Sequence, residues 1–322
     1  MPLISIVVPC YNEQESLPIF LKELDGVVHA MTQTHPDTSF EAVLIDDGSV
    51  DATLTVMKAE AASNHSYTIH WHSFSRNFGK EAALLAGLQH AKGDYVATMD
   101  ADMQDPPSLL PEMLQTLEAG EYDSVATRRV TRDGEPPIRS FFARMFYKLI
   151  NRISEADIVD GARDFRLMKR EMVDAIVSMC EYNRFSKGIF GWIGFKTKWL
   201  PYKNVERVAG ETKWSFFKLF KYSLDGIVNF SQAPLSIASV SGLILTAIAF
   251  FMILFVVIRR LIFGDPVAGW ASTVCIILFI GGVQLLCMGI MGQYLAKTYL
   301  EVKNRPHFII SETNDKDAKR IG

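Results

Sequence analysis

The feature that most constrains this chain is a pair of long apolar stretches near its carboxyl end. Leu235 to Ile258 contains no charged residue, and neither does Val267 to Ala296. Each stretch is long enough to cross the hydrocarbon core of a bilayer, which takes about 20 helical residues. Because the joining segment 259–266 is short, the two stretches predict a transmembrane helical hairpin. The alternative is a buried helical hairpin of a soluble protein.

Basic residues at both ends of the hairpin predict its orientation. Lysines and one arginine flank it on either side, namely Lys213, Lys218, Lys221, Lys297, Lys303 and Arg305. The positive-inside rule places these ends in the cytoplasm, although Arg259 and Arg260 in the turn argue weakly the other way. We therefore expect a multi-pass protein of the inner membrane with both termini cytoplasmic.

Segment boundaries follow from the same pattern. We expect a catalytic domain at 1–210, an amphipathic interfacial segment at 211–233 and a hairpin at 234–298, with spans at about 235–258 and 270–295. A cytoplasmic tail at 299–322 would complete the chain. The tail after Pro306 is polar and mixed in charge, which is typical of disorder.

The composition excludes several classes of protein. A net charge of −3 gives no bulk affinity for nucleic acid. The four cysteines have no paired or metal-like spacing, which favours a reducing compartment without disulfides. The amino terminus begins with a strand-like run at 3–8 and has no basic region or cleavage-like site, so we expect no signal peptide.

The first 130 residues alternate between strand-like and helix-like segments. Apolar runs predict strands at 3–8, 42–46, 68–74, 94–99 and 122–127, and helical periodicity predicts helices at about 14–31, 51–62, 79–91 and 108–119. This alternation predicts an α/β domain with a mostly parallel sheet and helices on both faces. Ligands of such sheets bind beyond the carboxyl ends of the strands.

Acidic residues follow several of these predicted strands. The most informative pair is Asp100 and Asp102, which follows the strand predicted at 94–99. Side chains two apart on a strand point to the same face, so the two carboxylates should lie together. Two carboxylates about 4 Å apart repel by roughly 4 kcal/mol at an effective dielectric near 20. A hard divalent ion such as Mg²⁺ or Mn²⁺, which also takes phosphate oxygens, would stabilise the pair. The alternative is that both are surface acids that cap the next helix.

Four motifs in order carry a resemblance to a known family. They are Val8-Pro9-Cys10-Tyr11-Asn12-Glu13, Asp46-Asp47-Gly48-Ser49-Val50-Asp51, Asn77-Phe78-Gly79-Lys80-Glu81 and Asp100-Ala101-Asp102-Met103-Gln104-Asp105-Pro106. The chain resembles glycosyltransferase family 2, whose members have the GT-A fold, a Rossmann-like α/β arrangement. No dinucleotide glycine fingerprint and no Walker phosphate loop is present.

Two further segments narrow the resemblance. Asp164-Phe165-Arg166-Leu167-Met168 and the run from Arg207 to Ser215 are similar to the polyprenyl-phosphate glycosyltransferases. The bacterial undecaprenyl-phosphate (bactoprenol) glucosyltransferases are the nearer match, and the dolichol-phosphate mannosyltransferases are more distant. The Gln-x-x-Arg-Trp signature of processive synthases is absent, which favours transfer of a single sugar.

The resemblance implies a donor site for a UDP-sugar, with Mg²⁺ or Mn²⁺ as cofactor. Asp102, with Asp100, would hold the metal against the diphosphate. Asp51 could contact the nucleoside or begin a helix, and the residues do not separate the two. The donor-binding residues implied are Pro9, Tyr11, Glu13, Asp46, Asp47, Lys80, Asp100, Ala101, Asp102, Gln104, Arg207 and Lys213.

The implied acceptor is a polyprenyl phosphate. Its phosphate is largely dianionic at neutral pH, so a strong general base is less necessary than for a hydroxyl acceptor. We expect Asp164 to position this phosphate or to orient Arg166, and these two residues with Asp102 are the catalytic candidates; a structural ion pair is the alternative for Asp164 and Arg166. Arg128 and Arg129 could bind the acceptor phosphate or be solvated surface bases.

The remaining expectations concern less specific features. His70 and His72 share a strand face, but we expect a packed or surface pair because no acidic partner is near in sequence. The segment 137–153 is either an ordinary amphipathic helix or a basic face near lipid headgroups. Gly282 and Gly289 share a helix face suited to close packing, so we expect a homo-oligomer, with a tetramer as one form. The rival functions are a sugar nucleotidyltransferase and a non-catalytic membrane scaffold.

Overall fold

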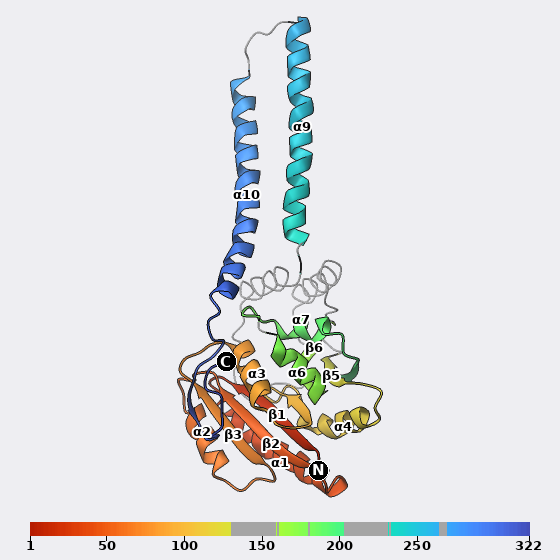
Figure 1. The fold of residues 1–322 in the computed structure, drawn as a ribbon, viewed down its shortest axis with the longest axis vertical. Helices are drawn as coiled ribbons and strands as arrows, with labels where there is room; N and C mark the ends of the chain where they lie inside the picture. Colours follow the sequence, from red (N-terminus) through yellow and green to blue (C-terminus); the bar gives the residue numbers. More distant parts are fainter. Residues whose placement is uncertain (130–158, 160, 180, 203–230, 232, 264–268) are drawn as a thin grey trace.

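The computed structural model describes residues 1–129, 159, 161–179, 181–202, 231, 233–263 and 269–322 (Figure 1). The interfacial segment predicted at 211–233 lies almost entirely outside this part of the chain, and the segment 137–153 lies entirely outside it. The predicted boundary at residue 210 also falls there.

Within the described residues, eight strands form one sheet in the order β7-β5-β6-β4-β1-β2-β3-β8. Their bounds are β1 Leu3–Cys10, β2 Ser39–Asp46, β3 Thr68–Phe74, β4 Tyr95–Thr98, β5 Ser124–Arg129, β6 Ala162–Lys169, β7 Thr197–Tyr202 and β8 Ile310–Thr313. The first five strands confirm the sequence prediction to within a few residues.

The direction of the strands is mixed. β1 pairs in parallel with β2 and β4, β2 with β3, and β5 with β7. β6 runs antiparallel to both β4 and β5, and β8 runs antiparallel to β3. The parallel centre therefore carries the strand ends predicted to bind ligand, and the insertion of β6 brings Asp164 to the same edge.

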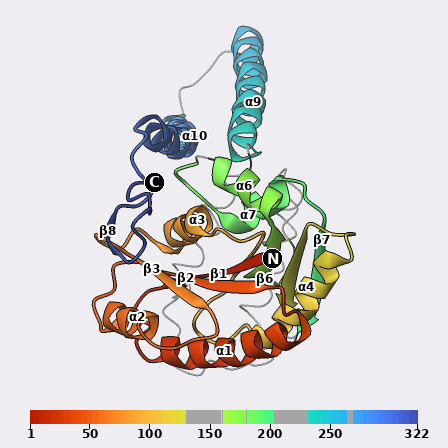
Figure 2. The ribbon, with the colours of Figure 1, turned by 60° about the horizontal axis from the view of Figure 1, so that its bottom comes forward.

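Helices cover both faces of the sheet, as predicted, and each face has its own core (Figure 2). On one face lie α1 (Ser16–Thr34), α2 (Thr53–Ala61), a short 3₁₀ turn η1 (Pro107–Leu109) and α4 (Leu110–Glu118). On the other lie α3 (Lys80–His90), α6 (Arg170–Ser178) and α7 (Ser186–Trp192). β1 contributes side chains to both cores, because Ile6 packs on the first face and Val7 on the second.

The tail after Pro306 is ordered, so the expectation of disorder is wrong. Although the tail is polar overall, it contains three consecutive apolar residues, 308–310. Phe308 is fully buried against α3 and stacks on Phe74, with the ring centroids 5.2 Å apart. Ile310 then begins β8, which pairs with the edge of β3. Burial of these side chains and a strand pairing more than 200 residues distant in sequence stabilise a segment that has little local preference for order.

Two long helices, α9 (Ala233–Phe263) and α10 (Trp270–Val302), rise side by side from the α/β domain (Figure 1). Within them Ala233–Met252 and Phe279–Lys303 are long and apolar enough to cross a membrane, and neither is buried in the protein. The second of these segments lies further along the chain than the predicted span at 270–295. The helices agree with the predicted hairpin and indicate membrane association.

Candidate active site

The loops that follow β1 and β2 are locked together by hydrogen bonds. Asn12, in the left-handed conformation with φ 56°, receives the N–H of Val50 at 3.0 Å on its side-chain oxygen and donates its own N–H to Ser49 Oγ at 2.9 Å. Asp51 accepts the N–H of Thr53, the first residue of α2, at 3.0 Å. The geometry therefore favours the helix-start interpretation of Asp51.

Asp47 holds the loop that leads into α3. Its carboxylate accepts the N–H of Phe78 at 2.7 Å and that of Gly79 at 3.0 Å. Burial raises the pKa of Asp47 to about 6, and these two hydrogen bonds offset part of the rise. The carboxylate thus fixes the start of α3, whose first residue is Lys80.

Asp46 is tied into the protein as well. Its two oxygens accept the N–H of Ser49 at 3.0 Å and the hydroxyl of Ser73 at 2.7 Å, and the residue is 1% exposed. Asp47 is 3% exposed. Their contacts with the donor stay predictions, and the described geometry gives both residues a role in shaping the loops.

Lys80 lies between two of the predicted functional acids. Its Nζ is 2.8 Å from the carboxylate of Asp100 and 2.6 Å from Oδ2 of Asp164. Burial would raise the pKa of Asp164, but the charges of Lys80 and Lys187 hold that pKa well below its ordinary value. The turn after β4, the start of β6 and the start of α3 thus meet in one charged cluster.

The strand argument for Asp100 and Asp102 is wrong in detail. β4 ends at Thr98, and the chain turns over the next residues, with Met103 in the left-handed conformation at φ 60°. Asp102 accepts the N–H of Gln104 at 3.1 Å, which stabilises the turn. Turn geometry rather than strand alternation therefore places the two acids.

A buried carboxylate, Asp105, lies at the centre of a neighbouring network. It accepts hydrogen bonds from Nε of Arg163 at 3.2 Å and from the hydroxyl of Tyr202, and it is fully buried. Arg163 also donates to Oε1 of Gln104 at 3.1 Å. The predicted donor residue Gln104 is thereby held by the residue that precedes Asp164.

Arg166 does not form the ion pair with Asp164 that the sequence left open. The residue is 3% exposed, its Nε has no hydrogen-bond partner, and its guanidinium carbon lies 3.6 Å from the centroid of the Phe190 ring. Burial lowers the pKa of Arg166 to about 9, which the charge of Asp164 only partly opposes. The carboxylate of Asp164 is bonded to Lys80 instead.

The other predicted residues occupy three settings. Tyr11 is 39% exposed and Ala101 is 2% exposed, at the ends of β1 and β4. Arg128 and Arg129 end β5, where Arg129 donates its N–H to the carbonyl of Gly161 at 3.0 Å. Pro9 and Glu13 are partly buried. Arg207 and Lys213 lie outside the described residues.

The histidine pair is packed, as expected. His72 is fully buried, its ring centroid is 4.3 Å from that of His90, and burial lowers its pKa to about 3. His70 is partly exposed, with Nε2 3.7 Å from a carboxylate oxygen of Glu41. A neutral buried imidazole in this setting is a structural residue.

Sequence reasoning missed residues whose importance depends on contacts across the fold. Glu81 accepts the N–H of Ser186 at 3.0 Å and so joins α3 to α7. Arg163 and Tyr202 converge on Asp105 from residues 58 and 97 positions away. The only sequence signals were adjacency: Glu81 follows Lys80 in a matched motif, and Arg163 precedes Asp164.

The acidic cluster lies beyond the carboxyl ends of parallel strands, which is the edge where α/β sheets generally bind their ligands. The family model described as "Glycosyl transferase family 2" matches residues 5–177, more than half of the chain. The chain therefore belongs to glycosyltransferase family 2 and is a glycosyltransferase.

Relatives match over nearly the whole chain. A protein of Bacillus subtilis (strain 168) named "Putative glycosyltransferase CsbB" is 43% identical over 97% of this chain and 92% of its own length. The "SfII prophage-derived bactoprenol glucosyl transferase" of Shigella flexneri is 42% identical over 97% and 98%. A solved structure of mannosyl-3-phosphoglycerate synthase from Rubrobacter xylanophilus aligns at 20% identity and a TM-score of 0.47, over 70% and 72% of the two chains.

Proposed function

We propose that this glycosyltransferase moves one glucose from UDP-glucose to polyprenyl (undecaprenyl) phosphate at the cytoplasmic face of the inner membrane, with inversion at the anomeric carbon. The observation that carries the proposal is the 42% identity to a bactoprenol glucosyl transferase over 97% of this chain, the two apolar helices included. An N-acetylhexosamine, mannose or a modified pentose is the alternative sugar.

The turn after β4 fits a divalent ion shared with the donor. Among the described residues no group of three acidic, histidine or cysteine side chains gathers to hold an ion by itself. Asp100 and Asp102 supply hard carboxylate oxygens, and Mg²⁺ is commonly bound by one or two carboxylates together with substrate phosphates. Bound there, Mg²⁺ or Mn²⁺ would neutralise charge that builds on the UDP leaving group.

Asp164 fits a positioning role better than that of a base. A general base works best when its pKa lies near the working pH, whereas the pKa of Asp164 is held well below its ordinary range. The acceptor phosphate is already largely dianionic at neutral pH and can attack without losing a proton. Asp164 would therefore keep Lys80 and the acceptor in place, with Lys80 offsetting the negative charge of the two reactants.

The hairpin suits an acceptor that stays in the bilayer. Each buried CH₂ group of a lipid is worth about 0.8 kcal/mol, so a long prenyl chain does not leave the membrane. At the domain-side end of the hairpin, Tyr294 of α10 donates its hydroxyl to the carbonyl of Ser231, just before α9, at 2.6 Å. Glu301 of α10 accepts the N–H of Tyr182 at 3.0 Å, which joins the hairpin to the α/β domain. The cytoplasmic orientation follows from the basic flanks.

The test is a transfer assay with membranes that contain the protein. Membranes are incubated with a panel of labelled UDP-sugars and undecaprenyl phosphate, first with EDTA and then with Mg²⁺ or Mn²⁺ restored. We expect a lipid-linked product with UDP-glucose only when metal is present. Product from another UDP-sugar alone would replace glucose, and no product from any of them would refute the proposal.

A pair of variants tests the site. Asp164→Asn should lower kcat by about 100-fold or more while binding of UDP with Mn²⁺ stays unchanged, because loss of a positioned charged group costs roughly 3 kcal/mol. Asp174→Asn is the matched control, since the Asp174 carboxylate is 67% exposed and pairs only weakly with Arg170 at 3.7 Å. A kcat for Asp164→Asn within a few-fold of wild type would remove Asp164 from the mechanism.

A further inference from the structure

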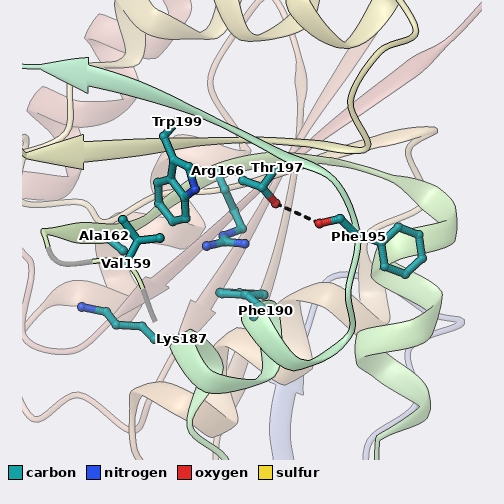
Figure 3. A pocket seen from close by; sticks show the side chains of 9 residues that line it. Val159, Ala162, Arg166, Lys187, Phe190, Phe195, Thr197 and Trp199 are labelled. Atoms are coloured by element: carbon teal, nitrogen blue, oxygen red, sulfur yellow. Dashed lines mark hydrogen bonds between the residues drawn. The ribbon is translucent and has the colours of Figure 1, made fainter. Parts of the chain in front are cut away.

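A cavity of about 190 Å³ lies between β6, β7 and α7 (Figure 3). Its walls combine two cations, Arg166 and Lys187, with the aromatic rings of Phe190 and Trp199 and the methyl-bearing side chain of Val159. In the site described above, Arg166 is a neighbour of Asp164 and Lys187 is a charge that lowers the pKa of Asp164, and neither has been assigned a ligand. The cavity therefore needs an explanation of its own.

The buried charge of Arg166 would be stabilised by an anion bound in the cavity. This side chain is 3% exposed, its Nε has no hydrogen-bond partner, and it contacts aromatic faces, with its guanidinium carbon 3.6 Å from the Phe190 centroid and 6.0 Å from that of Trp199. The adjacent carboxylate of Asp164 is taken by Lys80. Because a buried charge without a paired anion is costly, a ligand that brings an anion into the cavity would be held strongly.

The cavity adjoins the charged cluster. Asp164 and Arg166 are two residues apart on β6, so their side chains leave the same face of the sheet. That face is the one covered by α3 and α7, which supply Lys80 and Lys187. Lys187 is near Asp164, because its charge is among those that lower the pKa of Asp164. It is also near Arg166, because both side chains line the cavity.

Size and polarity favour the acceptor over the donor. Pockets that enclose a whole small-molecule ligand usually measure about 300–1,000 Å³. A cavity of about 190 Å³ is too small for a nucleotide sugar but suits one phosphate with a short apolar group. The aromatic walls would be poor surroundings for a free phosphate and good ones for the first carbons of a prenyl chain, and α7 lies on the side of the domain from which α9 and α10 rise (Figure 1).

We propose that this cavity holds the phosphate and the first isoprene unit of the prenyl phosphate acceptor, with Arg166 and Lys187 as the phosphate ligands and Phe190 and Trp199 as the apolar wall. The assignment rests on the proposed function for its choice of a prenyl phosphate. It adds Lys187 to the site and places the acceptor on α7 and on β6, which carries Asp164, whereas Arg128 and Arg129 on β5 were the phosphate ligands expected from the sequence.

The experiment measures binding, so that it does not depend on turnover. The full-length protein in mild detergent is titrated with geranylgeranyl monophosphate, and separately with UDP and Mn²⁺, by calorimetry. Lys187→Gln is compared with Lys198→Gln, an exposed lysine on β7 whose ammonium contacts the Tyr122 ring. Geranylgeraniol and inorganic phosphate are titrated as the two halves of the probe.

We expect Lys187→Gln to weaken binding of geranylgeranyl monophosphate about 10- to 100-fold, as for loss of one charge-assisted hydrogen bond, and to leave binding of UDP with Mn²⁺ unchanged. Lys198→Gln should bind both ligands as wild type does. Arg166→Lys, which keeps the charge but loses the planar fork, should weaken the prenyl probe alone.

Three results would overturn the assignment. The first is equal affinity of Lys187→Gln and Lys198→Gln for the prenyl probe. The second is an equal loss of UDP binding in Lys187→Gln, which would assign the cavity to the donor. The third is inorganic phosphate binding as tightly as the probe, which would make it a simple anion site. If wild type transfers no sugar while probe binding still depends on Lys187, the proposed function fails and the cavity assignment stands.

Discussion

Arg166→Met tests whether Arg166 is kept for function at a cost in stability. The wild-type guanidinium is buried without an acceptor for its Nε, and within the described part of the chain it faces the rings of Phe190 and Trp199, with the carboxylate of Asp164 nearby. Replacing buried charges by apolar side chains of similar volume is often neutral or stabilising by about 1–4 kcal/mol. Loss of the contact with Phe190 removes up to about 2 kcal/mol of cation–π attraction.

With about 1 kcal/mol of cation–π attraction lost, the net expectation is a gain of about 0–3 kcal/mol in the free energy of unfolding, or up to roughly 10 °C in Tm for a domain of this size. The sign follows from the pKa. At pH 7 the guanidinium is charged in the folded and the unfolded state, so the cost of burial is fully present.

The assay is thermal unfolding in mild detergent at one scan rate, followed by tryptophan fluorescence, with Arg163→Met as the control. Arg163 is also a largely buried arginine on β6, but it donates to Asp105 and Gln104. Its loss leaves the carboxylate of Asp105 buried with one partner fewer, so we expect that variant to lose about 3–5 kcal/mol. If Arg166→Met lost stability as Arg163→Met does, the reasoning about an uncompensated charge would be refuted.

Three further predictions concern the loops and the tail. Because burial raises the pKa of Asp47 to about 6, lowering the pH from 7 to 5 should stabilise wild type by about 1 kcal/mol relative to Asp47→Asn, and equal responses in urea unfolding would contradict this. Gly48→Ala should cost about 2 kcal/mol or more in the same assay, since φ is 66° and the new Cβ would lie 2.4 Å from the carbonyl carbon of Arg76; a loss under 0.5 kcal/mol would show that the turn relaxes. Phe308→Ala should cost about 3–5 kcal/mol and expose the tail to limited proteolysis, and an uncut tail would argue against its docking.

The parts of the fold that the sequence predicted are those fixed by local pattern. β1, β2 and β4 are largely buried on both faces and are mostly apolar runs in the sequence, and the helices between the strands show their own periodicity. Their polar residues fall at strand ends by the same logic, which is why Asp100 could be placed in the site. The hairpin was predictable because about 20 apolar residues have few other stable environments.

The parts that the sequence did not predict depend on pairings between distant residues. Lys80 and Asp164 are 84 residues apart, and no pattern in either segment indicates that they meet. The strand argument for Asp102 failed because β4 ends at Thr98, one residue earlier than predicted, and a turn follows it. The tail was misjudged because its order comes from β3 and α3, against which it packs.

The segment between α6 and α7 explains why the hairpin and the reaction site belong to one enzyme. Tyr182, just before α7, donates its N–H to Glu301 in the last turn of α10, and Ser186, the first residue of α7, donates its N–H to Glu81, the neighbour of Lys80. α7 also carries Lys187 and Phe190 of the cavity. In our proposal the wall that receives the lipid phosphate is thus fixed on one side to the membrane hairpin and on the other to the charged cluster. An acceptor that cannot leave the bilayer requires such a connection, because its phosphate must reach the donor at a depth that the membrane helices set.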